Sequence, residues 1–229
     1  ISDPVLDVGI GKAFAQVGGC DHEKFMARGA DYDPGEVPHT NLPYCIAVEG
    51  LDGSGKSTVV RLLAERMGAS IVTNPPSSMA GDRAANDAQP EGKKRAWYLE
   101  ANIAATAEAS RHQLAGRPVI MDRSTASTVA FAAAWEGRSA DGNDWPGQVP
   151  RPDLLILLDV PEPVRLSRLR ARATIETNEE MRLRLDEPFS SRVLESYVAL
   201  GAIRIGAETS PEEIVRRIMR LVENGASSR

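Results

Sequence analysis

The chain has 229 residues, of which 42% are apolar and 26% charged, and its formal net charge is −5 at pH 7. This length fills one domain, with or without an appendage, and the acidic balance excludes a broad basic face for nucleic acid or anionic lipid. No apolar run approaches the about 18 residues that a membrane-spanning helix needs. The spacing of Cys20 and Cys45 favours free thiols over a metal site or a disulfide. We expect a cytoplasmic or mitochondrial protein, and because the sequence starts at Ile1 we also expect that an upstream segment was removed.

Residues 1–43 carry Gly, Pro and Asp at frequent intervals, and we expect an N-terminal appendage of unknown role there. From Tyr44 onward, short apolar runs alternate with stretches of helical periodicity. The runs that predict strands are 44–48, 70–72, 118–121, 154–160 and 202–205. Helices are expected over 56–67 before Gly68, over about 94–115, after Ser124, on both sides of Glu176, and after Ser210 and Pro211. This alternation predicts an α/β fold with a five-stranded parallel sheet and helices on both faces.

The segment from Gly50 to Ser57, GLDGSGKS, fits the phosphate-loop pattern GxxxxGK[ST] between a predicted strand and a predicted helix. Glycines let backbone N–H groups turn around a phosphate, the helix N-terminus adds its positive end, and Lys56 reaches the β and γ phosphates. The residues expected to bind ATP are Gly50, Gly53, Ser54, Gly55, Lys56, Ser57 and Thr58. A chance glycine-rich turn is disfavoured because every fixed position and both flanking elements match. The pattern predicts a P-loop NTPase that uses Mg²⁺ with ATP, with Ser57 as a metal ligand.

A second motif, MDRSTASTVAF, follows the strand predicted at 118–121 and begins with Asp122 and Arg123. Ligands of open α/β sheets bind at the carboxyl ends of the strands, where this pair is expected. The Asp122 carboxylate can orient Mg²⁺ and its waters, while the Arg123 guanidinium can hold a phosphate in two hydrogen bonds. The alternative is a surface pair that caps a helix. With the phosphate loop nearby, we expect Lys56, Asp122 and Arg123 to serve phosphoryl transfer.

The stretches VEGLDGSGKST, MDRSTASTVAF, PDLLILLDV and PEPVRLSRLRARA resemble the thymidylate kinase family of nucleoside monophosphate kinases, over about residues 44–222. NPPSS, KRAWYLEANIAATAEA and DWPGQVPRPD are most similar to its mitochondrial UMP/CMP kinase branch. The resemblance implies a kinase domain over 44–225 with a lid at about 168–187. It also implies that Asp52 faces the sugar of the acceptor, although a simple turn residue is the alternative from the residues alone.

Some family members carry an arginine directly after the acidic residue that corresponds to Asp52, where the present chain has Gly53. The charge for the transferring phosphate is then expected from the lid. Arg168 and Arg172 are the candidates, with Arg170, Arg182 and Arg184 behind them; for each of these, a solvated helix face is the alternative.

The acceptor site departs from the family pattern at Ser77, Leu99 and Ile103, where many members have an arginine, an aromatic residue and an arginine. The residues expected to bind the acceptor are Asp52, Arg83, Tyr98, Asn102, Arg123, Ser127 and Phe131. Trp97 and Tyr98 can stack on the base, although an aromatic residue on an alanine-rich helix is more often core. We expect a broadened pocket that accepts pyrimidine monophosphates.

These features predict an enzyme that moves the γ-phosphoryl group of Mg-ATP onto dTMP, UMP, CMP or their deoxy forms, in nucleotide biosynthesis. Two alternatives remain: a nucleoside or other small-molecule kinase on the same scaffold, and an inactive nucleotide-binding module. The expected partners are small-molecule nucleotides, without nucleic acid or membrane, and a homodimer is left open.

Overall fold

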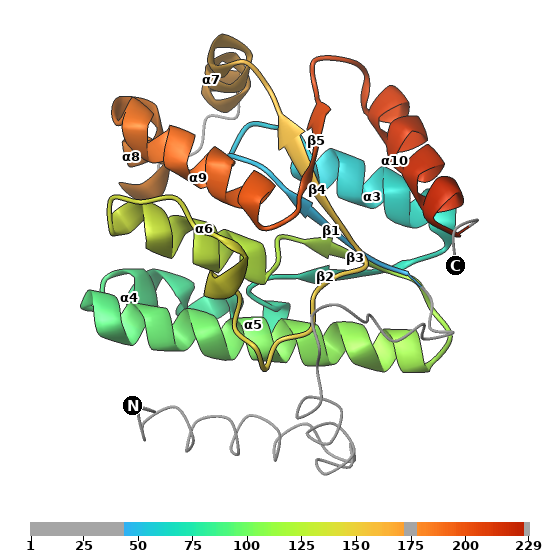
Figure 1. Ribbon diagram of the computed structural model, residues 1–229, viewed down its shortest axis with the longest axis horizontal. Helices are drawn as coiled ribbons and strands as arrows, with labels where there is room; N and C mark the ends of the chain where they lie inside the picture. The colour runs from blue at the N-terminus through green and yellow to red at the C-terminus, as the bar shows by residue number, and fades with distance from the viewer. Residues whose placement is uncertain (1–43, 172–177, 227–229) are drawn as a thin grey trace.

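Five parallel strands form the centre of the fold in the computed structural model, which describes residues 44–171 and 178–226 (Figure 1). Their order across the sheet is β2-β3-β1-β4-β5. The strands are β1 (Cys45–Glu49), β2 (Ser70–Thr73), β3 (Val119–Asp122), β4 (Leu154–Asp159) and β5 (Ile203–Gly206). Parallel strands with apolar residues on both faces require cover on both sides of the sheet.

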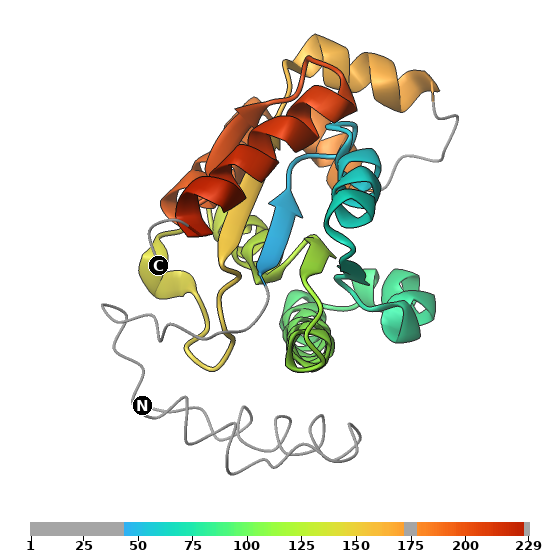
Figure 2. The ribbon, with the colours of Figure 1, turned by 90° about the vertical axis from the view of Figure 1, so that its right-hand side faces the viewer.

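Helices supply that cover. They are α3 (Lys56–Met67), α4 (Arg83–Asp87), α5 (Glu91–Leu114), α6 (Thr125–Trp135), α7 (Glu162–Ala171), α8 (Asn178–Leu185), α9 (Glu187–Ala199) and α10 (Pro211–Ala226), with 3₁₀ turns η1 (Ser77–Asp82) and η2 (Gly142–Asp144). Successive residues of a strand point to opposite faces. Along β1, Ile46 and Val48 pack with α3 and α10, whereas Ala47 packs with α5, α6 and α9. Figures 1 and 2 show these two layers on either side of the sheet.

The predicted five-stranded parallel sheet with helices on both faces is confirmed, with each strand end within one residue of its expected position. Helix α5 begins three residues earlier than expected, at Glu91 after the N-cap Pro90, because its polar first turn carries no apolar period. The short elements η1 and α4 were not predicted, for the same reason. Within the described ranges, no helix is long and apolar enough to cross a membrane.

The region expected to be a lid, 168–187, is divided between two helices. Helix α7 ends at Ala171 and α8 begins at Asn178, and Arg172 and Glu176 lie outside the described residues. On α8, Leu183 is 1% exposed and belongs to the same apolar cluster as Phe189 of α9. The second half of the region therefore packs against the body of the protein.

The sheet topology brings the predicted motifs together. Strand β1 pairs with β3 on one side and with β4 on the other, so the chain order reverses next to β1, where open α/β sheets bind ligands. The segment after β1 is the phosphate loop, which leads directly into α3. Because Val48 is paired with Asp122 across β1 and β3, the end of β3 lies beside that loop.

Candidate active site

The phosphate loop, residues 50–57, requires glycine at two positions where its backbone lies close to another backbone carbonyl group. Gly50 has φ of 147°, and a Cβ there would lie 2.7 Å from the carbonyl oxygen of Leu158. Gly53 has φ of 87°, and a Cβ there would lie 2.8 Å from the carbonyl oxygen of Arg165 on α7. Backbone atoms cannot yield as a side chain can. The packing of α7 therefore leaves no room for an arginine at position 53, which accounts physically for the glycine.

Lys56 lies inside the loop, with 7% of its surface exposed. Its Nζ donates to the carbonyl oxygens of Gly50 (2.8 Å) and Leu51 (3.2 Å) and lies 3.6 Å from Asp52 Oδ1. Burial, together with the nearby charge of Arg123, lowers the pKa of Lys56 to about 8, against the opposing effect of the surrounding carboxylates. A polyphosphate at this point would favour the charged amine and would be held by it.

Ser57 and Asp122 place two oxygen ligands side by side, although they lie 65 residues apart in the sequence. Ser57 Oγ donates to Asp122 Oδ2 at 3.2 Å. Magnesium prefers a few protein oxygens and completes its shell with water and substrate phosphates. A hydroxyl and a carboxylate beside a phosphate loop fit that donor set. Among the residues that the structure describes, no cluster of three or more His, Cys, Asp or Glu offers a metal a fuller protein cage.

Arg123 joins the end of β3 to the phosphate loop. Its Nη2 donates to Asp52 Oδ1 at 2.6 Å, and its Nη1 donates to Ser127 Oγ at 3.3 Å. Burial alone would lower the pKa of Arg123, but Asp52 and other anionic neighbours raise it. Burial likewise opposes ionisation of Asp52, yet Arg123 and Lys56 together hold its pKa below the usual range. The pair stays charged at neutral pH and closes the site between loop and sheet.

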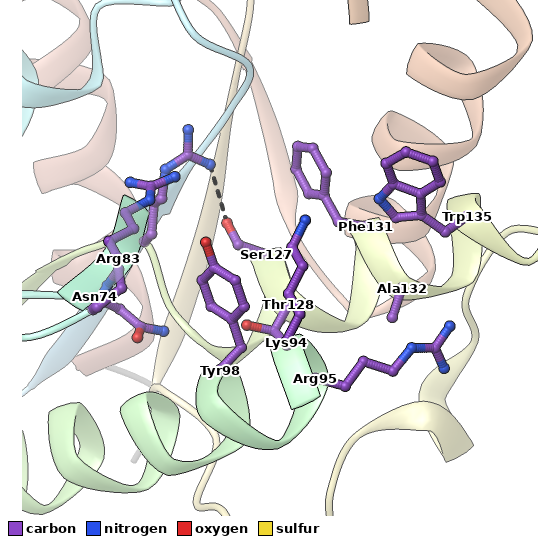
Figure 3. Close-up of a pocket in the computed structure, with 12 residues that line it drawn as sticks. Asn74, Arg83, Lys94, Arg95, Tyr98, Ser127, Thr128, Phe131, Ala132 and Trp135 are labelled. Carbon is purple, nitrogen blue, oxygen red and sulfur yellow. Dashed lines mark hydrogen bonds between the residues drawn. The ribbon is translucent and has the colours of Figure 1, made fainter. Parts of the chain in front are cut away.

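Two cavities meet at Arg123. Asn74, Pro75, Arg83 and Arg123 line both of them. The cavity beside the phosphate loop, which we call the phosphate cavity, is lined in addition by Asp52, Gly53, Gly55, Lys56, Ser57, Thr73, Ala80 and Asp122. The other cavity, which we call the acceptor cavity after the residues expected to bind the acceptor, is lined in addition by Lys94, Arg95, Tyr98, Ser127, Thr128, Phe131, Ala132 and Trp135. Figure 3 shows the acceptor cavity, with Lys94 and Tyr98 rising from α5 toward Ser127 and Phe131 of α6.

Most of the residues expected at the acceptor site line these cavities, and the exception is Asn102. This side chain is 1% exposed, and its Oδ1 accepts hydrogen bonds from Asn74 (2.7 Å) and Thr128 (3.2 Å). Asn102 therefore orients two lining residues from beneath the cavity. Trp97 is also absent from the described lining; its ring packs edge-on against Tyr98, with 4.9 Å between centroids.

Arg83 and Tyr98 share a carboxylate that the sequence did not single out. Tyr98 Oη donates to Asp87 Oδ1 at 2.8 Å, and Arg83 Nε lies 3.6 Å from Asp87 Oδ2. Helix α4 thereby contacts two side chains of the acceptor cavity, of which Arg83 also lines the phosphate cavity. Lys94, Arg95 and Thr128 were also missed, because a cation or hydroxyl on a helix gives no sign in the sequence of which cavity it faces.

The arginines expected in the lid have different surroundings. Arg168 donates to the carbonyl oxygens of Ser54 (3.1 Å), Ala207 (3.1 Å) and Gly53 (3.5 Å), so it binds the outer side of the phosphate loop. The guanidinium of Arg182 stacks on Trp135, 3.8 Å from the ring centroid. Arg172 lies outside the described residues.

Known proteins are similar to this chain in sequence. The sequence model of the thymidylate kinase family matches residues 48–218. A thymidylate kinase of Cereibacter sphaeroides is 33% identical over 204 residues, covering 76% of this chain and 91% of the relative. Human mitochondrial UMP-CMP kinase 2 is 31% identical, and the match covers 80% of this chain and 43% of that protein. A probable thymidylate kinase of Pyrobaculum aerophilum is 30% identical, and the match covers 78% of this chain and 95% of that protein. The chain therefore belongs to the thymidylate kinase family of nucleoside monophosphate kinases.

Proposed function

We propose that this ATP-dependent monophosphate kinase acts on pyrimidine nucleotides and converts dTMP, UMP, CMP or their deoxy forms to diphosphates. The observation that carries the proposal is the pair of cavities that meet at Arg83 and Arg123. One cavity contains the phosphate loop, and the other is bounded by aromatic rings from α5 and α6. Relatives named thymidylate kinase and UMP-CMP kinase 2 support a pyrimidine acceptor.

In this proposal the donor triphosphate lies in the phosphate cavity. Lys56 and the loop N–H groups hold its β and γ phosphates, and Ser57 and Asp122 would hold Mg²⁺. The ion, when bound, offsets negative charge on the phosphates as the phosphoryl group moves. The protein's own contribution is alignment, because phosphoryl transfer depends mainly on positioning and on stabilisation of charge.

The acceptor monophosphate lies in the second cavity, with its phosphate between Arg83 and Arg123. Guanidinium groups suit this task because they bind phosphate oxygens in pairs of hydrogen bonds. Asp52 faces the sugar, where its carboxylate can accept a hydrogen bond from a hydroxyl. The base lies between Tyr98 and Phe131, which both line this cavity, and a pyrimidine places one ring there where a purine would place two.

The test is ADP release with Mg-ATP and a panel of nucleosides and monophosphates. Turnover with pyrimidine monophosphates, weak turnover with AMP and GMP, and none with nucleosides would support the proposal. Turnover with nucleosides would favour a nucleoside kinase instead. A profile dominated by purines, or by dTMP with UMP and CMP inert, contradicts the broadened pocket, and no release with any acceptor would indicate an inactive nucleotide-binding module.

Arg83→Ala is expected to raise KM for every accepted monophosphate by a similar factor, roughly 10- to 150-fold, because one charge-assisted hydrogen bond to the acceptor phosphate is lost. Steady-state kinetics across the panel measures this factor. Arg61→Ala is the matched control, because Arg61 is an exposed arginine of α3 paired with Glu65. Unchanged acceptor affinity in Arg83→Ala would remove its proposed role as the anchor.

Arg168→Ala is expected to slow the chemical step by about tenfold or more, because the loop loses the guanidinium that fixes its carbonyl groups and offsets nearby charge. Single-turnover measurements with saturating ATP report this step. The control is Arg216→Ala, which removes an exposed arginine of α10 paired with Glu213. A wild-type rate in Arg168→Ala would transfer the catalytic role to Arg172 or to Arg170, Arg182 or Arg184.

A further inference from the structure

A buried carboxylate lies directly before the phosphate loop. Glu49 is the last residue of β1 and is 0% exposed. Burying a carboxylate is costly unless hydrogen bonds satisfy its oxygens. Its Oε1 accepts from the backbone N–H (2.7 Å) and the hydroxyl (2.7 Å) of Ser124, and its Oε2 accepts from the hydroxyl of Ser127 (2.6 Å). These donors come from the segment that immediately follows Arg123.

The hydroxyl of Ser127 transmits this contact to Arg123. A serine hydroxyl has one proton to donate and two lone pairs to accept with. Its proton goes to Glu49, so Tyr197 Oη, 3.0 Å away, donates to Ser127, as does Arg123 Nη1 at 3.3 Å. The hydroxyl is thereby fully used. Glu49 fixes which way Ser127 presents its lone pairs, and one of them receives the Arg123 guanidinium.

The backbone at Arg123 also needs support. Its φ of 68° is left-handed, a conformation that a residue with a Cβ adopts only where its surroundings hold it. Arg123 N donates to the Val48 carbonyl at 3.2 Å, and the next N–H, that of Ser124, donates to Glu49. The end of β1 therefore holds both peptide groups of this turn.

We propose that Glu49 is a positioning residue for phosphoryl transfer, acting through Ser124 and Ser127 to hold Arg123 between the phosphate cavity and the acceptor cavity. Because Glu49 directly precedes Gly50, its hydrogen bonds with Ser124 and Ser127 link the start of the phosphate loop to the segment that carries Arg123. Burial raises the pKa of Glu49, and the donors from Ser127 and Ser124 together with the charge of Arg123 oppose that rise. The proposal rests on the monophosphate kinase activity and is independent of which base is preferred.

The experiment is a double-mutant cycle with Glu49→Gln and Arg123→Ala, assayed with ATP and the monophosphate that gives the wild type its highest kcat/KM. The glutamine keeps the shape but places an amide NH₂ against hydrogen-bond donors. We expect Glu49→Gln to lower kcat/KM for the acceptor by about 10- to 100-fold, since small displacements of a positioned group have effects of this size. KM for ATP should change by less than about twofold, because Lys56 and the loop are untouched.

In the Arg123→Ala background, Glu49→Gln should have no further effect, because the group it positions is already absent. Glu65→Gln, at an exposed glutamate of α3 paired with Arg61, is the matched control and should behave as wild type. If the losses of kcat/KM from the two substitutions were additive, Glu49 would merely support the fold and the proposal would be overturned. The same conclusion would follow if Glu49→Gln raised KM for ATP by the same factor as it lowered kcat/KM for the acceptor. If Glu49→Gln does not fold, Ser124→Ala removes a hydroxyl that donates to Glu49 at a residue that lines neither described cavity, and the same cycle with Arg123→Ala decides the question.

Discussion

Lys56→Ala is expected to lower kcat for phosphoryl transfer by at least about 100-fold while the fold is retained. The amine lies inside the loop, within hydrogen-bond reach of two loop carbonyl groups, and not in either apolar cluster. Its loss removes a charge that stabilises the β and γ phosphates, and no other described cation lines the part of the cavity formed by the loop itself. Coupled ADP release gives kcat, and circular dichroism with thermal unfolding reports the fold.

The matched control is Lys93→Ala, at an exposed lysine of α5 that lines neither described cavity. This variant should keep wild-type kcat, because it changes the net charge equally without touching the site. If Lys56→Ala were folded and turned over at the wild-type rate, the assignment of residues 50–57 as the donor-phosphate loop would be wrong.

Asp122→Asn is expected to lower kcat by about 100-fold or more and to change acceptor KM by only a small factor. The carboxylate accepts a hydrogen bond from Ser57 at 3.2 Å, and it lines the phosphate cavity but not the acceptor cavity. An amide keeps its size but loses the charge that binds a divalent cation. Kinetics at increasing Mg²⁺ measures the effect, and the concentration of Mg²⁺ needed for half-maximal turnover should rise.

Asp159→Asn provides the control for this change. Asp159 also ends a strand at the same edge of the sheet, but it pairs with Arg204 and lines neither described cavity. Its variant should retain the wild-type Mg²⁺ dependence. Should Asp122→Asn weaken acceptor binding and leave kcat unchanged, Asp122 would be an acceptor-binding residue and not a metal ligand.

Local sequence patterns predicted the elements that carry the chemistry. The strand, loop and helix around Lys56 follow from apolar runs and from glycines whose spacing a phosphate loop requires, and both signals lie within about 20 residues of chain. The position of Asp122 at the end of a strand followed from the same local reasoning. The polar segment at 77–87 was missed as structure because it carries no apolar period, although it supplies Arg83 and Asp87 to the site.

The sequence by itself therefore determined the fold class, the family and the donor-phosphate motif, because each depends on residues close together in the chain. Tertiary structure alone decided which side chains share a cavity. Glu49 faces Ser124 and Ser127 across 75 or more residues, and Arg168 reaches the loop across 114 residues to Ser54. No periodicity encodes such contacts, since they depend on strand order and on the packing of helices against the sheet, and these determine which distant side chains can form hydrogen bonds.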